Sequence, residues 1–173
     1  DQWTLSELYS LISKVEAGME AFEPTRAFRP IQEFTTEKLS NWYVRLGRRL
    51  FWKGAYEADK ISAYQTLWTC LETLSRLMAP LAPFYADQLY TDLHKGIAKT
   101  GEPSVHLTDF PPVHAQAVTA PLETTLNLAR PRTSLVLSIR TTENPTVRQT
   151  LARLLMPAFT EAVLVHPSPA PDA

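Results

Sequence analysis

Apolar residues in the first twenty positions recur at alternating spacings of three and four, which is one face of an amphipathic helix. A second helical pattern begins at Pro24, a residue that suits a helix start, and extends to Gly54, a natural helix stop. Pro30 lies inside this span, so a kink or break is expected near Arg29. The first stripe comprises Leu5, Leu8, Ile12, Val15 and Met19.

Two further helical stripes follow and complete a predicted bundle over residues 1–98. The first ends at the double-proline segment "APLAPF", and the second comes directly after it. Short connections of this kind favour antiparallel neighbours. The first stripe contains Leu67, Cys70, Leu71, Leu74, Leu77 and Met78, and the second contains Leu89, Tyr90, Leu93 and Ile97.

The C-terminal half has a less regular pattern. Residues 99–120 are rich in Pro, Thr and His and lack a helical period, which predicts a linker or long loop. Residues 121–165 predict a helical appendage, with a bend or break at Pro131, a short helix after Pro145 and a possible strand in "FTEAVLVH". Residues 166–173 predict a disordered tail. The predicted fold class is therefore all-α: an antiparallel helical bundle of about four main helices with a smaller C-terminal helical appendage.

Composition narrows the class of protein. The chain has 173 residues, of which 45% are hydrophobic and 20% charged, as in globular proteins with a buried core. Its only cysteine, Cys70, excludes a disulfide framework and indicates a reducing compartment, for which we expect the cytoplasm. No apolar run approaches the roughly 20 residues that span a bilayer, so no membrane partner is expected. The sequence lacks an initiator Met, and we expect it to be part of a longer protein.

One segment, "LSNWYVRLGRRLFWKG" (Leu39 to Gly54), concentrates positive charge and indole rings and contains no acid, although the whole chain has a net charge of -1. On a helical wheel with about 100° per residue, its apolar residues form a core stripe and its basic residues lie on another arc. Trp42 lies at the border between the two arcs. The expected core stripe is Leu39, Tyr43, Leu46 and Leu50.

The basic arc has the chemistry of an RNA-binding surface. Guanidinium groups bind phosphates in a bidentate manner, and indoles stack on unpaired bases. A basic stripe with an aromatic ring is what a single-stranded RNA loop requires. Two other interpretations are open: a solvated helix face, or a protein-interaction module whose basic face docks an acidic partner helix. The predicted RNA-binding residues are Asn41, Arg45, Arg48, Arg49, Trp52 and Lys53.

The sequence shows no pattern of a catalytic or metal site. The histidines His94, His106, His114 and His166 have no recognisable zinc spacing. "SVHLTDF" contains the residue types of a hydrolase triad, Ser104, His106 and Asp109, but lacks a nucleophile elbow and an oxyanion glycine motif. The five glycines form no phosphate-binding loop. No catalytic residue, cofactor or metal is therefore expected in this chain.

Several longer segments of the sequence resemble segments of isoleucyl-tRNA synthetases, which are class Ia aminoacyl-tRNA synthetases. "LSNWYVRLGRRLFWKG", "DKISAYQTLWTCLETLSRLMAPLAPFYADQLYTDL" and "SVHLTDFP" occur in the order seen in that family. "DQWTLSEL" resembles the start of its anticodon-binding helical domain, and "SLVLSIR" with "VRQTL" resembles the segment after the bundle. The resemblance is strong from Asp1 to about Pro111 and weaker from Leu122 to Pro157. The related valine and leucine enzymes share the helical bundle but match these segments less well. The equivalent domain of a valine or leucine tRNA ligase is therefore an open alternative.

The resemblance implies a function in protein biosynthesis. The parent enzyme, an isoleucine--tRNA ligase, would join isoleucine to its tRNA with ATP, and this chain lacks the nucleotide-binding motifs and the editing domain. The chain would therefore be inactive by itself and hold no cofactor. Its partners would be the anticodon stem-loop of the isoleucine tRNA and the catalytic and editing domains of the same parent chain. The family's basic helix maps onto Asn41, Trp42, Tyr43, Arg45, Arg48, Arg49 and Trp52.

The chain departs from the family pattern in its second helical tract. Pro131 and Arg132 lie where the family has a continuous helix. Thr146 and Thr150 replace residues of the family's "KVRQPL" segment. The resemblance therefore implies a shorter or bent second tract, without the family's further C-terminal RNA-contacting portion.

Overall fold

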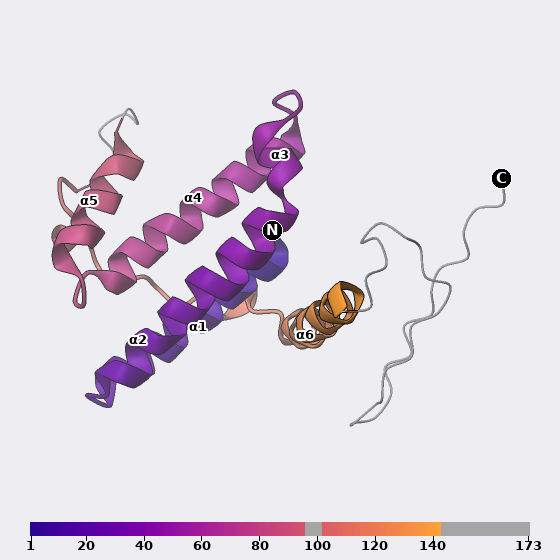
Figure 1. Ribbon diagram of the computed structural model, residues 1–173. Coiled ribbons are helices and arrows are strands. Elements are labelled where there is room, and N and C mark those ends of the chain that lie inside the picture. The colour runs from indigo at the N-terminus through magenta and orange to yellow at the C-terminus, as the bar shows by residue number, and fades with distance from the viewer. Residues whose placement is uncertain (96–101, 143–173) are drawn as a thin grey trace. The chain divides into compact units, whose positions relative to one another are not determined.

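The computed structural model describes residues 1–95 and 102–142. It divides into two compact units, Asp1–Arg130 and Pro131–Ala173, and each is considered by itself. All regular elements of the described residues are helices and none is a strand, which confirms the all-α prediction (Figure 1). The elements are α1 (Gln2–Glu20), α2 (Pro24–Glu33), the π-helix η1 (Phe34–Val44), α3 (Arg48–Trp52), α4 (Ala58–Met78), α5 (Pro83–His94), the 3₁₀ turns η2 (Val105–Leu107) and η3 (Ala115–Ala117), and α6 (Ala120–Thr142).

The core of the first unit lies where α1 meets α2, η1 and α4 (Figure 1). The stripes predicted from the sequence supply many of its side chains, because their spacing places them on one face of each helix. Met19, the last residue of the first stripe, is exposed instead. The buried cluster comprises Leu8, Leu11, Ile12, Val15, Ala27, Ile31, Phe34, Leu39, Cys70, Leu74 and Leu77.

Helices α1 and α2 cross closely at Gly18. A Cβ atom added there would lie 2.7 Å from the backbone nitrogen of Ala27, so only glycine permits this approach. The chain reverses between the two helices at Phe22, whose φ of 56° is in the left-handed region. The Phe22 side chain is 92% exposed. The reversal therefore places an aromatic ring in solvent rather than in the core.

The second predicted helix does not break at Arg29. Helix α2 passes through Pro30 to Glu33, and the backbone then continues as the π-helix η1. The N–H of Arg45 donates to the carbonyl of Ser40, five residues back, which is the hydrogen bond of a π-turn. The break expected near Arg29 is therefore absent, and a change of hydrogen-bond register begins further along, at Phe34.

The π-helix also explains why part of the predicted core stripe is wrong. Leu46 is 66% exposed and Leu50 is 38% exposed, although the wheel placed both in the core. The wheel assumes about 100° per residue, and eleven residues of wider turns rotate every later side chain away from that position. Phe51 is buried in their place.

The segment expected as a linker holds local structure in its described part, residues 102–120. Val105 in η2 is 2% exposed and packs with Ala86 and Tyr90 of α5. Helix α6 then runs without a break through Pro131, where the sequence pattern suggested an interruption. The boundary between the two compact units falls inside α6, after Arg130. The helix predicted after Pro145, the strand at 159–166 and the tail at 166–173 lie outside the described residues.

Candidate nucleic-acid interface

The short helix α3 is held in place by one buried aromatic residue, Phe51. Its ring centroid lies 6.1 Å from that of Tyr43 in η1 and 5.4 Å from that of Tyr64 in α4, both in edge-to-face geometry. The hydroxyl of Tyr64 also donates to the Phe51 carbonyl at 2.9 Å. Because Phe51 fastens α3 to both neighbours, the other side chains of this short helix are directed away from the core.

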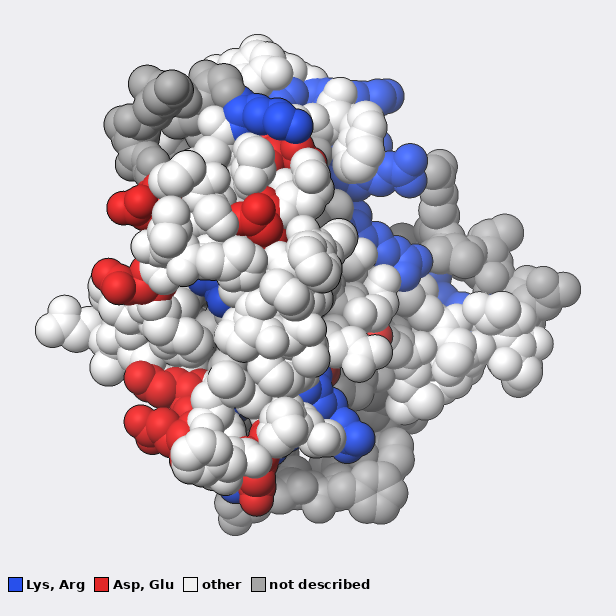
Figure 2. All heavy atoms as spheres, turned by 90° about the vertical axis from the view of Figure 1, so that its left-hand side faces the viewer, with Lys and Arg blue, Asp and Glu red and all other residues white. Residues whose placement is uncertain are grey.

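Four basic side chains lie exposed on or beside α3: Arg45, Arg48, Arg49 and Lys53. Within the described residues none of them forms an ion pair, whereas Arg76 pairs with Glu72. Figure 2 shows several Lys and Arg side chains in the upper part of the molecule, and in Figure 1 both α3 and the end of α5 lie at that height. Cations without a carboxylate partner are available to phosphate groups.

An exposed indole accompanies these bases. Trp52 is 69% exposed, and the guanidinium carbon of Arg48 lies 5.6 Å from its ring centroid, within the range of a cation–π contact. The exposure predicted for Trp52 is therefore confirmed, while its contact with RNA stays a prediction. Helix α3 ends at Trp52, and Gly54, the expected helix stop, follows two residues later with a φ of 90°.

Tyr56 is a further aromatic residue at this end that sequence reasoning missed. It is 78% exposed, and the Lys60 ammonium lies 4.7 Å from its ring centroid. Tyr56 lies two residues after the Gly54 turn, between exposed bases and the start of α4. This position is the sequence signal that could have predicted an exposed ring. Trp52 and Tyr56 thus offer two exposed rings on either side of one turn.

Asn41, also predicted to bind RNA, lies on η1 rather than on α3. Its side-chain amide donates to the Glu37 carboxylate at 3.4 Å, one turn earlier. Trp42 beside it is half-buried, as its border position predicted. The guanidinium carbon of Arg130 lies 6.0 Å from the Trp42 ring centroid. The sequence did not indicate Glu37 or Arg130, because 93 positions separate these two contacting residues.

Tyr43 fixes η1 to α4 and to the first residue of the chain. Its hydroxyl lies 2.5 Å from a carboxylate oxygen of Asp1 and 3.3 Å from the Ala63 carbonyl. Burial raises the pKa of Tyr43, so the phenol stays protonated and able to donate. The π-helix that carries Asn41 therefore has a defined position on the bundle.

This basic, aromatic end belongs to a chain that matches one family of known domains along most of its length. Residues 1–163 fit the family model described as the anticodon-binding domain of tRNA ligase. The chain belongs to this family. The family assignment agrees with the resemblance stated from the sequence words and with the all-helical fold.

Curated relatives of this anticodon-binding domain are named isoleucine--tRNA ligase. The protein of Cytophaga hutchinsonii is 51% identical over 157 residues, which are 91% of this chain and 14% of the relative. That of Porphyromonas gingivalis is 51% identical over 160 residues, 92% of this chain and 14% of the relative. That of Pyrococcus abyssi is 42% identical over 130 residues, 75% of this chain and 12% of the relative. The domain thus spans about one seventh of the length of these proteins or less.

The triad-like residues of the domain serve a structural purpose. Ser104 donates its hydroxyl to the Asp87 carboxylate at 2.6 Å, and the Val105 N–H donates to the same oxygen at 3.1 Å. The His106 backbone N–H, not its ring, donates to Ser104. These bonds lower the pKa of Asp87 and cap η2. Ser104 is therefore oriented as a cap and not as a nucleophile.

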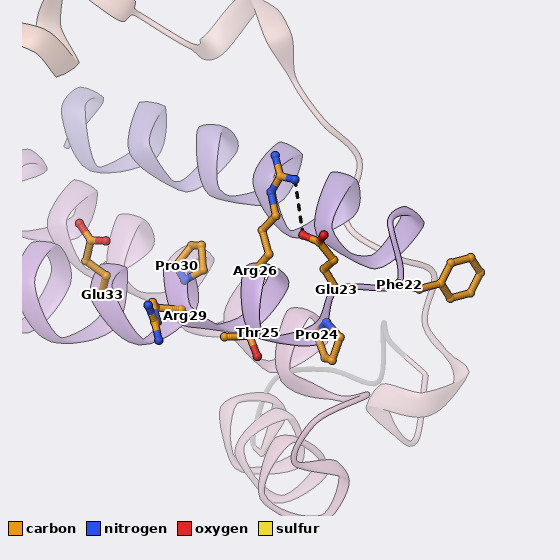
Figure 3. Close-up of a pocket in the computed structure, with 8 residues that line it drawn as sticks. All are labelled: Phe22, Glu23, Pro24, Thr25, Arg26, Arg29, Pro30 and Glu33. Atoms are coloured by element: carbon orange, nitrogen blue, oxygen red, sulfur yellow. Dashed lines mark hydrogen bonds and ion pairs between the residues drawn. The ribbon is translucent and has the colours of Figure 1, made fainter.

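A surface hollow of about 680 Å³ lies at the start of α2 (Figure 3). Its lining carries charges of both signs, and Arg26 and Glu23 form an ion pair at 3.5 Å. The ring of Phe22 points away from the other labelled residues in Figure 3. The hollow does not contain any of the predicted RNA-binding residues.

Two further features are absent from the described residues. No group of three or more His, Cys, Asp or Glu side chains is arranged to hold a metal ion. No helix among those residues has the length and apolarity needed to cross a membrane.

Proposed function

We propose that this domain binds the anticodon arm of the isoleucine tRNA through α3 and the adjoining end of η1. The observation that carries the proposal is the set of exposed bases that form no ion pair with any described residue, beside the exposed Trp52 indole. Their roles follow from their chemistry: Arg45, Arg48, Arg49 and Lys53 contact phosphates, Trp52 stacks on an unpaired base, and Asn41 offers an amide to a base edge.

The proposal extends to a longer parent protein that joins isoleucine to its tRNA in protein biosynthesis with ATP. The names of the relatives and the small share of their length that the chain matches support this step. The domain contributes recognition and positioning, while catalytic and editing domains of the parent supply the chemistry. The parent works in the cytoplasm, which the buried free thiol of Cys70 supports.

The test is a titration of an isoleucine-tRNA anticodon stem-loop into the domain and its variants at several salt concentrations. Arg48→Ala should weaken binding and reduce the slope of log affinity against log salt by somewhat less than one unit, because one phosphate contact is lost. Trp52→Ala should cost about 1–3 kcal/mol of binding and leave that slope nearly unchanged, because no charge is removed.

Matched controls separate these effects from general changes of charge or surface. Arg29→Ala removes an exposed guanidinium on α2, and Phe84→Ala removes an aromatic side chain that is 90% exposed at the start of α5. Both should leave binding within about twofold. Equal affinity for the stem-loops of valine and leucine tRNAs would contradict the isoleucine assignment. Loss of binding in the control variants would contradict the placement of the interface on α3.

A further inference from the structure

One arginine of α6 contacts both ends of a single turn of the π-helix. Nη2 of Arg130 donates to the backbone carbonyl of Glu37 at 3.0 Å and lies 3.8 Å from the Glu37 carboxylate. Its guanidinium carbon lies 6.0 Å from the ring centroid of Trp42. Glu37 and Trp42 are five residues apart, which is the separation that a π-turn closes with a hydrogen bond.

This pair of contacts distinguishes the π-helix from an α-helix. In an α-helix, residues five apart point about 140° away from each other, so one guanidinium could not reach both. In a π-helix, whose turn is closed by a hydrogen bond between residues five apart, these residues lie much nearer to one face. Arg130 therefore contacts two residues that the wider register brings toward one face, and these contacts favour that register over the α-helical one.

The part of α6 that carries Arg130 is itself fixed to the bundle by polar contacts. Asn127 donates to the carboxylate of Glu7 at 2.9 Å, and Lys38 of η1 lies 2.5 Å from the other oxygen of that carboxylate. One turn earlier, Glu123 accepts from the hydroxyl of Ser10 at 2.9 Å. Because residues 123, 127 and 130 share one helix face, this face holds the Arg130 guanidinium over η1.

We propose that Arg130 is a positioning residue that keeps η1 in its π-helical register and thereby sets the direction of Arg45 and of the α3 side chains toward the RNA. The inference rests on the proposed function for its RNA part. A return of η1 to α-helical turns changes the direction of every side chain that follows the turn, including those of Arg45 and α3.

The register is measured directly by NMR couplings across hydrogen bonds. In the unaltered 173-residue chain, the Arg45 N–H should couple to the Ser40 carbonyl. In Arg130→Met we expect the coupling to move to the Asn41 carbonyl, four residues back. Arg130→Lys keeps the charge but lacks the flat guanidinium that spans the turn, and we expect the same change of acceptor there. Ser40 remaining the acceptor in either variant overturns the proposal.

The consequence for RNA is measured with the isoleucine-tRNA anticodon stem-loop and the same variants. Arg130→Met should weaken binding about three- to tenfold, the equivalent of one or two misdirected hydrogen bonds. Arg132→Met, which removes the same charge from an exposed position two residues later on α6, should change neither the acceptor nor the affinity by more than about twofold. A changed acceptor with unchanged affinity overturns the RNA part of the proposal. Failure of the unaltered chain to bind contradicts the proposed function instead, and the couplings are read without RNA.

Discussion

At the scale of single residues, Cys70 is a thiol without access to solvent. It lies in α4 at 0% exposure among the side chains of the main core. Burial disfavours the thiolate and raises its pKa to about 12 from the ordinary value of 9.0. The thiol therefore stays protonated, and unreactive toward alkylating reagents, for as long as the core is closed.

This shifted pKa predicts how stability responds to alkaline pH. The unfolded chain releases the Cys70 proton near its ordinary pKa, whereas the folded chain retains it up to about pH 12, so the raised pKa stabilises the fold fully only below the unfolded pKa. Between about pH 9 and 10 the free energy of unfolding should fall with a slope that approaches about 1.4 kcal/mol per pH unit. Denaturant titrations measure this slope.

Cys70→Ala is the matched control for the pH experiment. Its unfolding free energy should change much less over the same interval, because the remaining group with a raised pKa nearby, Tyr43, has an ordinary value of 10.0 and titrates higher. An identical slope in the variant would show that the Cys70 thiol is not the group responsible.

At the scale of elements, η2 depends on one carboxylate. Asp87 of α5 accepts both the Ser104 hydroxyl and the Val105 N–H, and these bonds lower its pKa. Asp87→Asn should therefore loosen the segment and expose Leu107 and Phe110 to chymotrypsin more often. A faster first cleavage at these residues, read by mass spectrometry, is the expected result.

The same chemistry sets a pH dependence for this segment. Because the folded pKa of Asp87 is lowered, its stabilising effect is present above the unfolded pKa and is lost as pH falls through the folded pKa. Asp109→Asn, a change of the same kind at an exposed carboxylate, should leave cleavage unaltered. Equal cleavage rates in the two variants would show that the Asp87 contacts do not hold η2.

The sequence predicted those elements whose residues obey a regular period. Leu8, Ile12 and Val15 and the stripe of α4 around Leu74 lie in the core because an ordinary α-helix places them there. The predicted burial of Leu46 and Leu50 is wrong because a helical wheel with about 100° per residue assumes an α-helix and cannot reveal a π-helix.

The candidate site was predictable to a similar degree. The exposed bases and Trp52 follow from local composition and a nearby helix end. The role of Arg130 could not be predicted in this way. Its contacts with Glu37 and Trp42 join segments that are far apart in the sequence, and no local pattern indicates such a pairing.

At the scale of the whole molecule, the chain matches only about one seventh of the length of the isoleucine--tRNA ligases that it resembles. The purified chain should therefore show no isoleucine-dependent exchange of pyrophosphate into ATP. The measurement uses labelled pyrophosphate, with a full-length isoleucine--tRNA ligase as the positive control. Exchange that rises in proportion to the concentration of the purified domain would contradict this expectation.

Because the four tryptophans differ in burial, the intrinsic fluorescence of the domain can report ligand binding at one surface. Trp3 is 6% exposed, Trp68 is 37% exposed and Trp52 is 69% exposed, and Trp42 is half-buried. Indole emission shifts to longer wavelength in water, so the red edge of the spectrum comes mainly from Trp52, and a dissolved quencher such as iodide reaches that ring first. A ligand that covers the end of α3 would shield this red component and leave the blue component of Trp3 unchanged. The fluorescence of the unlabelled protein thus distinguishes occupation of this one surface from events elsewhere.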